Sequence, residues 1–428
     1  YKFNASLDSS KLNISFITDK LSYNHTYLQN SSLKIDNNNN KVTASLISDK
    51  FHVAGINIDS TQFILSLANN TLEIDTEYTN KGSMKNKFNF SSLINFTKAE
   101  FANRPIIDIN INPSVIYLNG ENWNFDIAKI VKQDSTIVFH DFSIYRENQY
   151  LKVDGIVSNN RYDTLSINLK NIDINPINYF IDEPPLNISG IISGKSFISD
   201  LYNNPSFDLS LYLNSIFINH HSLGDIEFHS NWNNRENYFN ISLINHLEAR
   251  LPLIVNGYYL PKEKALNLSA NLDNMSVSYF EPFLEGIVSK TGGSISGDIS
   301  IDGPLDRLKI RSNNSKMNEL SFVVDFTNVA YKLNGPLTIN ENTINFDNSI
   351  IRDRYGNIGR VSGGINHNFF KDIKLDINVM YNNLEILRTT ESDNSSFYGT
   401  AFGTGRMAIS GPINKILMDI FVTPNKST

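Results

Sequence analysis

The chain has 428 residues, of which 40% are hydrophobic and 19% are charged, and its 37 basic and 44 acidic residues give a net charge of −7. A chain of this length can bury more than one domain core. Both charges are spread along the chain without a basic block, so we expect no nucleic-acid partner. The absence of cysteine excludes disulfides, thiolate zinc sites and thiol nucleophiles.

No apolar run approaches the roughly 18 residues of a membrane-spanning helix. The sequence starts at Tyr1 and shows no signal-peptide pattern. We therefore expect a piece of a longer protein whose anchor or leader lies upstream.

Apolar residues recur at every second position along almost the whole chain. In chain order the clearest runs are Leu12, Ile14, Phe16; Phe63, Leu65, Leu67; Ile107, Ile109, Ile111; Leu165, Ile167, Leu169; Leu209, Leu211, Leu213; Leu266, Leu268, Ala270, Leu272; Phe322, Val324, Phe326; and Leu375, Ile377, Val379. Polar residues between them are typical of strands with one apolar and one wet face. The pattern predicts an all-β chain.

Asparagine is abundant between and within these runs. Its side chain disfavours helix interiors and tolerates turns, so turns are expected at short intervals. At about 12 residues per strand and turn, the chain would form about 35 strands. An open sheet rarely exceeds about 10 strands without curling or splitting, which leaves serial sandwiches, a solenoid or one long curled sheet.

Internal repeats are visible in the sequence. The stretch from Leu169 aligns with that from Leu272 at a shift of 103 residues, and the stretch from Leu268 aligns with that from Leu375 at a shift of 107. A glycine-punctuated strand follows each copy. We predict one continuous structure in four segments, 1–165, 166–270, 271–374 and 375–428, of which the first is only weakly repetitive.

One segment of each repeat breaks the period of two. Between Tyr279 and Val288 the apolar residues follow helical spacing, which predicts a short amphipathic helix. Pro282 is compatible with this helix only in its first turn. A lid over one end of the sheet is the structural role we expect for it.

The last third of the chain resembles a known family. Asp353-Arg-Tyr-Gly356, Val361-Ser-Gly-Gly-Ile-Asn-His367, the glycine-rich stretch to Gly405 and Ile409-Ser-Gly-Pro412 follow one another in an order similar to the C-terminal domain of the TamB family, in the AsmA-like superfamily. The earlier units match this family only in their general pattern of alternating strands and turns. The residues that carry the resemblance are Asp353, Gly356, Phe397, Tyr398, Gly399, Gly405 and Gly411.

The resemblance implies a long, taco-shaped, largely antiparallel sheet with an apolar concave groove and a few short helices. It also implies a periplasmic protein that is anchored in the inner membrane by a segment outside this chain and extends to the outer membrane. The implied partners are phospholipid acyl chains and an outer-membrane barrel protein of the TamA type. No cofactor, metal or catalytic residue is implied.

Elementary energetics agree with a lipid ligand. A sheet that is apolar on one face must cover that face. Exposing a chain of about 16 carbons to water costs about 0.8 kcal/mol per CH₂, or about 12 kcal/mol, which an apolar groove would largely remove. The predicted groove-lining residues are Leu165, Ile167, Leu169, Leu209, Leu211, Leu213, Leu266, Leu268, Leu272, Phe322, Val324, Phe326, Leu375, Ile377 and Val379.

Catalytic motifs do not stand out. The stretch Gly190-Ile-Ile-Ser-Gly-Lys195-Ser196 has three residues between its glycines where a phosphate-binding loop needs four, and it continues as a strand. His220, His221, His229 and His246 lack the spacing of a zinc site. We therefore expect a non-enzymatic lipid conduit. The alternatives are a scaffold for outer-membrane protein insertion, which would bind strands by augmentation, and a polysaccharide-active β-helix protein, which the repeat length of about 105 residues disfavours.

Overall fold

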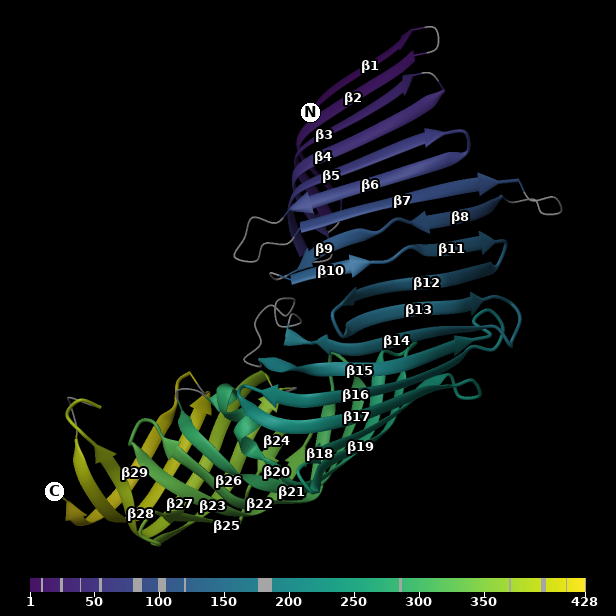
Figure 1. Ribbon diagram of the computed structural model, residues 1–428. Helices are drawn as coiled ribbons and strands as arrows, with labels where there is room; N and C mark the ends of the chain where they lie inside the picture. The colour runs from purple at the N-terminus through teal and green to yellow at the C-terminus, as the bar shows by residue number, and fades with distance from the viewer. Residues whose placement is uncertain are drawn as a thin grey trace. The chain divides into compact units, whose positions relative to one another are not determined.

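The computed structural model describes residues 1–8, 11–23, 26–38, 40–53, 56–79, 87–98, 105–118, 121–175, 187–284, 287–368, 371–393, 398–412 and 414–427. Over these ranges the chain forms 29 strands that join into a single hydrogen-bonded antiparallel sheet (Figure 1). The predicted all-β fold is therefore confirmed. The strands are fewer than expected because several are long, up to the 19 residues of Lys371–Thr389.

The chain divides into two compact units, Tyr1–Asp182 with Ile191–Leu211, and Glu183–Gly190 with Tyr212–Thr428. The first unit holds most of the strands β1 (Lys2–Asp8), β2 (Lys11–Tyr23), β3 (Thr26–Asn38), β4 (Lys41–Val53), β5 (Ile56–Ala68), β6 (Thr71–Thr79), β7 (Lys87–Thr97), β8 (Ile106–Ile111), β9 (Ser114–Leu118), β10 (Glu121–Phe125), β11 (Ala128–Gln133), β12 (Thr136–Arg146), β13 (Gln149–Val157), β14 (Thr164–Asp173), β15 (Ile188–Ser199) and β16 (Ser206–Ile218). The last two of these strands contribute residues to both units.

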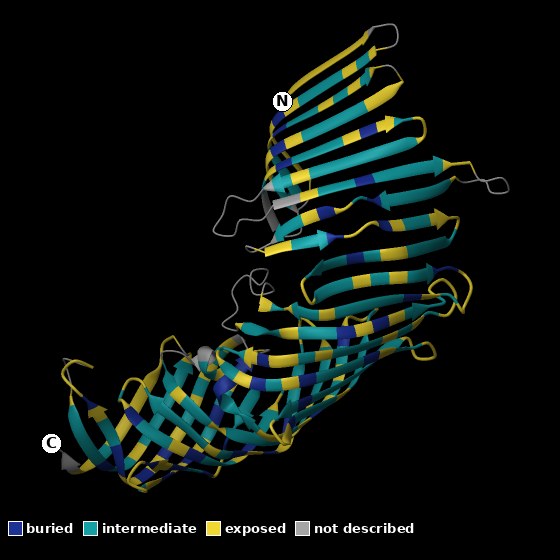
Figure 2. Cartoon of the chain, viewed as in Figure 1, coloured by how far each residue is buried: buried dark blue, intermediate teal, exposed yellow. Residues whose placement is uncertain are grey.

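The second unit continues with β17 (His221–Asn233), β18 (Tyr238–Leu247), β19 (Arg250–Leu260), β20 (Ala265–Ser276), the 3-10 helix η2 (Val277–Leu284), β21 (Val288–Pro304), β22 (Lys309–Val324), β23 (Val329–Asn340), β24 (Thr343–Asn345), β25 (Ser349–Asp353), β26 (Ile358–Asn368), β27 (Lys371–Thr389), β28 (Gly399–Pro412) and β29 (Leu417–Ser427). Along several of these strands, buried and exposed residues alternate (Figure 2).

Within the described residues, three strand positions are each shared by a pair of short strands. β7 pairs with both β8 and β9, β12 pairs with both β10 and β11, and β23 pairs with both β24 and β25. Pro113 lies between β8 and β9, and proline cannot donate to a strand ladder. Pro113 therefore explains why the hydrogen-bond ladder is interrupted between β8 and β9.

The three predicted repeats share a bulge. Asn171, Asn274 and Asn383 each adopt a left-handed backbone conformation, with φ of 51°, 53° and 51°, beside a shift in strand register. Asparagine tolerates this conformation better than most residues. The backbone N–H of each asparagine donates to a hydroxyl oxygen of the next strand. The acceptor is Ser193 for Asn171 (2.9 Å), Ser296 for Asn274 (3.0 Å) and Thr404 for Asn383 (3.0 Å).

The bulge gives the repeats a structural counterpart. The first two copies keep the 103-residue shift for both the asparagine and its hydroxyl partner. In the third copy, Asn383 lies two residues beyond the position that the 107-residue shift assigns. The segment boundaries stay a prediction.

The predicted amphipathic helix is present in shortened form. η2 spans Val277–Leu284, and the chain re-enters the sheet at Val288. The hydroxyl of Tyr279 donates to the carbonyl oxygen of Ser222 in β17 over 2.7 Å. In the third copy, the aligned residues up to Leu387 continue β27 as a strand, so the helix has no counterpart in this copy. The corresponding segment of the first copy lies largely outside the described residues.

Candidate functional site

Cross-strand pairing and strand alternation place the predicted groove residues of β14 and β16 on one face of the sheet. Leu165, Ile167 and Leu169 of β14 lie opposite Gly155, Val153 and Leu151 of β13, and opposite Ile198, Ser196 and Gly194 of β15. A side chain added to Gly194 would meet Leu211, and Leu209 and Leu213 share the face of Leu211 because strand faces alternate. We refer to this face as the inner face and to its opposite as the outer face.

The same holds within the second unit. Leu266, Leu268 and Leu272 of β20 lie opposite Gly303, Ile301 and Gly297 of β21. Phe322 and Val324 of β22 pair with Tyr331 and Val329 of β23, and Leu375, Ile377 and Val379 of β27 pair with Ile365, Gly363 and Val361 of β26. All but one of the predicted positions in this unit therefore lie in strands with their apolar side chains on a common face.

Phe326 is the exception. β22 ends at Val324, and Phe326 lies in the turn before β23, where Asn328 adopts a positive φ of 51°. The side chain is exposed in this turn. Strand pairing therefore does not place Phe326 on the inner face, because the alternation of apolar residues extends past the end of the strand.

The inner face of the first unit is partly uncovered. Val42 pairs with Leu67, and Ala44 pairs with Leu65, between β4 and β5. The exposed fractions of Val42, Leu65 and Leu67 are 36%, 37% and 43%. Among the described residues, β2 to β6 make substantial contacts only with their neighbours in the sheet. These side chains therefore lie on a single layer.

A row of buried hydroxyl groups crosses this layer. Thr18, Ser31, Ser48 and Thr61 follow one another as cross-strand partners from β2 to β5, and all four residues are buried. Ser31 donates to the Ser48 hydroxyl over 2.7 Å, and Ser48 donates to the carbonyl oxygen of Lys50 over 2.7 Å.

The hydroxyl row adjoins irregularities in the strand ladder. Asn30 and Ser60 carry positive φ angles of 49° and 50° beside it, and the hydroxyls of Thr18 and Ser48 donate to backbone carbonyl oxygens where the ladder is interrupted. This row of hydroxyl residues was not predicted from the sequence. The available signal was a single hydroxyl residue continuing each apolar alternation, as Thr18 does after Phe16.

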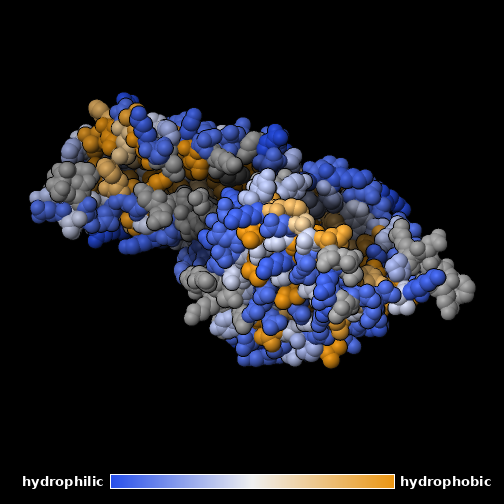
Figure 3. All heavy atoms as spheres, turned by 90° about the horizontal axis from the view of Figure 1, so that it is seen from above, coloured by the Kyte–Doolittle hydropathy of each residue, from blue (hydrophilic) through white to orange (hydrophobic). Residues whose placement is uncertain are grey.

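In the second unit, part of the inner face is covered by its own side chains. Met317, Leu333, Leu337, Phe346, Ile351, Val361, Val379, Tyr381 and Leu384 form a buried cluster across β22 to β27, with Phe322 and Ile377 packed against it. Figure 3 shows hydrophobic residues along a hollow between hydrophilic rims in the part that holds the C-terminal strands. Val379 is thus a core residue in this conformation.

The motif residue Asp353 organises a buried polar cluster in the same unit. Its carboxylate accepts hydrogen bonds from the backbone N–H of Tyr355, Asn357 and Glu385, each over 2.9 Å, and from the Asn357 side-chain amide over 2.8 Å. The Tyr331 hydroxyl donates to the carbonyl oxygen of Glu385 over 2.7 Å. These contacts join β23, the end of β25 and β27.

Glu385 is the most unusual member of this cluster. Its side chain is 0% exposed, and its Oε1 accepts a hydrogen bond from Nη2 of Arg354 over 2.6 Å. Its Oε2 has no hydrogen-bond partner among the residues that the structure describes. Burial raises the pKa of the Glu385 carboxyl above its ordinary value, although Arg354 opposes this shift.

The raised pKa of Glu385 predicts a pH-dependent contribution to stability. The neutral carboxyl is favoured in the folded state, so its contribution is complete below the ordinary pKa of 4.5 and is lost as the pH rises through the raised folded value. We expect the stability of the wild type relative to E385Q to fall as the pH rises above 4.5. Urea midpoints of both proteins across a pH series measure this. A difference that stays constant with pH would contradict it.

The remaining motif residues do not form one site. Gly356 lies in the turn between β25 and β26, whereas Gly399, Gly405 and Gly411 lie in β28. Tyr398 precedes β28 and is exposed. Phe397 lies outside the described residues. Gly190 to Ser196 lie within β15, as expected for a strand and not for a phosphate-binding loop.

In the described part of the chain, no helix is long and apolar enough to cross a membrane. No group of three or more histidine or acidic residues is placed to hold a metal ion within those same ranges. Compared with models of protein families, with curated proteins and with solved structures, the chain matches none of them. The apolar inner face is the most extensive feature of the residues that the structure describes.

Proposed function

We propose that this chain is a non-enzymatic conduit for phospholipid, in which acyl chains lie against the inner face and headgroups stay in water. The observation that carries the proposal is the uncovered apolar layer of the first unit around Val42, Leu65 and Leu67. A soluble protein rarely leaves contiguous apolar surface of more than a few hundred Å² open unless it binds something there.

The ligand class follows from the form of this surface. Apolar inner-face positions recur from strand to strand, as in Leu33, Leu46 and Phe63 of β3, β4 and β5. A ligand that covers them must be long and apolar, and each CH₂ removed from water contributes about 0.8 kcal/mol. An acyl chain has both properties.

The setting of the conduit rests on the family resemblance. The motifs between Asp353 and Pro412 are similar to those of TamB-like proteins, so we propose that the chain works in the periplasm and carries phospholipid between inner and outer membranes. An outer-membrane barrel of the TamA type is the partner that this resemblance supplies.

Acidic substitutions on the inner face test the conduit. We expect the double variant L65D/L67D to lose most of the phospholipid that co-purifies with the wild type, because two carboxylates would oppose acyl-chain burial. Both side chains are partly exposed, so the fold should tolerate the change. Quantitative mass spectrometry of extracted lipid, expressed per mole of protein, measures the effect.

The outer face of the neighbouring strands supplies a matched control. Ile17 and Ile47, each 46% exposed, both lie opposite Ser32 of β3. The variant I17D/I47D should retain its lipid. Equal lipid in both double variants, or none in the wild type, would reject the conduit. A photo-crosslinker at Leu67 that captures polypeptide and no lipid would favour the scaffold for outer-membrane protein insertion.

A further inference from the structure

A second surface lies on the outer face of the C-terminal strands. Arg360 of β26 lies opposite Met380 of β27, Met380 opposite Arg406 of β28, and Arg406 opposite Phe421 of β29. Val379 and Met407, their neighbours in sequence, carry the inner-face positions of β27 and β28. The row therefore faces away from the buried cluster. With Ile358, these four residues make up what we refer to as the outer patch.

The outer patch is both apolar and exposed. The exposed fractions of Ile358, Met380 and Phe421 are 46%, 65% and 67%. Together with Arg360 and Arg406 they border a shallow depression of about 720 Å³, to which Gly359 and Gly405 also contribute. Further along the outer face of β27, the exposed residues are polar, namely Lys374, Asp376 and Asn378. The patch is therefore a local feature of this face.

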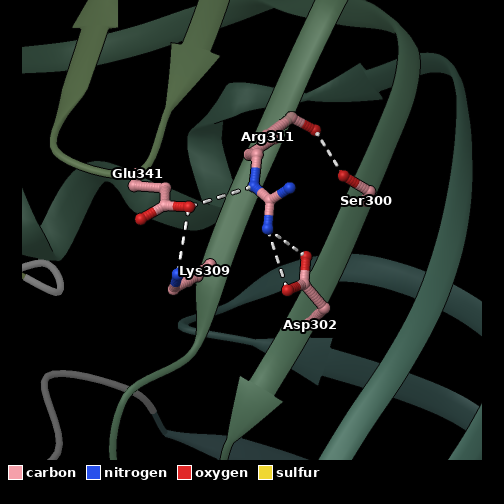
Figure 4. Close-up of polar contacts among 5 residues, drawn as sticks. All are labelled: Ser300, Asp302, Lys309, Arg311 and Glu341. Atoms are coloured by element: carbon pink, nitrogen blue, oxygen red, sulfur yellow. Dashed lines mark hydrogen bonds and ion pairs between the residues drawn. The ribbon is translucent and has the colours of Figure 1, made fainter.

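The two arginines of the patch differ from another outer-face arginine in their described partners. Figure 4 shows Arg311, another arginine of the outer face. Its guanidinium donates two hydrogen bonds of 2.7 and 2.8 Å to Asp302 and lies 3.7 Å from the Glu341 carboxylate. Unlike Arg311, neither Arg360 nor Arg406 forms an ion pair with a carboxylate of the residues that the structure describes. Arg406 lies over the ring of Phe421 at 5.7 Å instead.

The spacing of the charges favours an extended anionic surface. One strand separates Arg360 from Arg406, which corresponds to about 9.6 Å between their backbones. Exposed apolar side chains lie between and beside them. Basic residues interleaved with Phe, Met and Ile are the composition that binds anionic membrane interfaces, where the apolar groups insert below the headgroups.

A polypeptide fits this surface less well. Extended peptides bind mainly at free sheet edges and amphipathic helices bind in apolar grooves. The outer patch lies on the face of the sheet around a shallow depression, and of its members only Phe421 belongs to the last strand, β29. We propose that the outer patch docks the chain onto the surface of an anionic phospholipid bilayer. This docking does not depend on what the inner face binds.

Vesicle flotation with the full chain tests the docking. The probes are vesicles of phosphatidylcholine alone and vesicles of phosphatidylcholine mixed with phosphatidylglycerol. We expect partition onto the mixed vesicles that weakens with added salt, and little onto the neutral ones. A basic residue near an anionic surface contributes about five-fold to partition, so R360Q/R406Q should bind about thirty-fold less.

Two further variants separate charge from apolar insertion. K374Q removes a positive charge from the same face of β27, six residues from Met380 and thus about 20 Å away. This exceeds the screening length of about 8–10 Å, so K374Q should bind like the wild type. M380S/F421S should also bind more weakly, because it removes the inserted groups and leaves both arginines.

The readouts distinguish this proposal from the conduit. L65D/L67D should float with anionic vesicles as the wild type does, and R360Q/R406Q should keep its co-purified lipid. Equal partition of R360Q/R406Q and the wild type would overturn the docking. So would arginine-dependent binding of an acidic polypeptide such as polyglutamate without binding of vesicles.

Discussion

Replacing Asp353 with Ala is expected to lower the free energy of unfolding of the second unit by about 3–5 kcal/mol. The Asp353 carboxylate accepts four hydrogen bonds from Tyr355, Asn357 and Glu385. Without it, the buried N–H of Glu385 loses its partner, and unsatisfied buried groups are costly. The chain has two tryptophans, so urea unfolding of a W123F background can be followed through Trp232 of the second unit.

The expected loss depends on burial, and an exposed carboxylate on a nearby turn supplies the control. Asp347 is exposed and accepts one hydrogen bond, from the backbone N–H of Gly363 over 2.6 Å. D347A should cost no more than about 1 kcal/mol. If D353A unfolds at the same urea concentration as D347A, the cluster around Asp353 does not stabilise this unit.

The faces of the sheet could be predicted from sequence because strand geometry has a period of two. Leu165, Ile167 and Leu169 share a face for this reason alone, whatever their neighbours are. Residues that are directly opposite each other in paired strands point to the same face of the sheet, as Leu268 and Ile301 do. An alternating sequence therefore determines which side chains share a surface, provided that the strand continues.

The extent of burial could not be predicted in this way. Leu67 is partly exposed and Val379 is buried, although both continue similar alternations. The difference depends on how tightly the sheet curves, and curvature depends on bulges. Asn274 and Asn383 mark such bulges only through a left-handed backbone, for which an asparagine among many other asparagines is a weak signal.

Contacts between strands that are not neighbours in the sheet also could not be predicted from the sequence. Tyr331 and Glu385 are 54 residues apart and lie in β23 and β27, which are separated by two other strand positions. Only a strongly curved sheet brings them into contact. The sequence motif around Asp353 contains no sign of its hydrogen bond with the Glu385 N–H, which only the structure shows.

The two units therefore use the same inner-face pattern differently. In the second unit, side chains such as Met317 and Leu333 cover one another, and the apolar face contributes to folding. In the first unit, Leu65 and Leu67 contribute less to a core because they remain partly exposed. For this reason, acidic substitutions test ligand binding more cleanly in the first unit than in the second.

Replacing Gly405 with Ala is expected to lower the stability of the second unit by about 2–3 kcal/mol. An added Cβ would overlap the backbone carbonyl oxygen of Phe421 in β29. Because this oxygen belongs to the neighbouring strand, no side-chain rotation relieves the overlap, and β28 and β29 must separate. Hydrogen exchange should therefore accelerate at the amides that pair these two strands.

Gly356 provides the comparison that isolates the overlap. It has a positive φ of 88°, and nothing lies within 4 Å of an added Cβ. G356A should therefore incur only the conformational penalty of about 1 kcal/mol and leave exchange in β28 and β29 unchanged. Since Gly405 does not rely on a left-handed backbone, its larger cost must come from the proximity of β29. Equal losses in G356A and G405A, with unchanged exchange in both, would show that β29 is too loosely attached to resist the added methyl group.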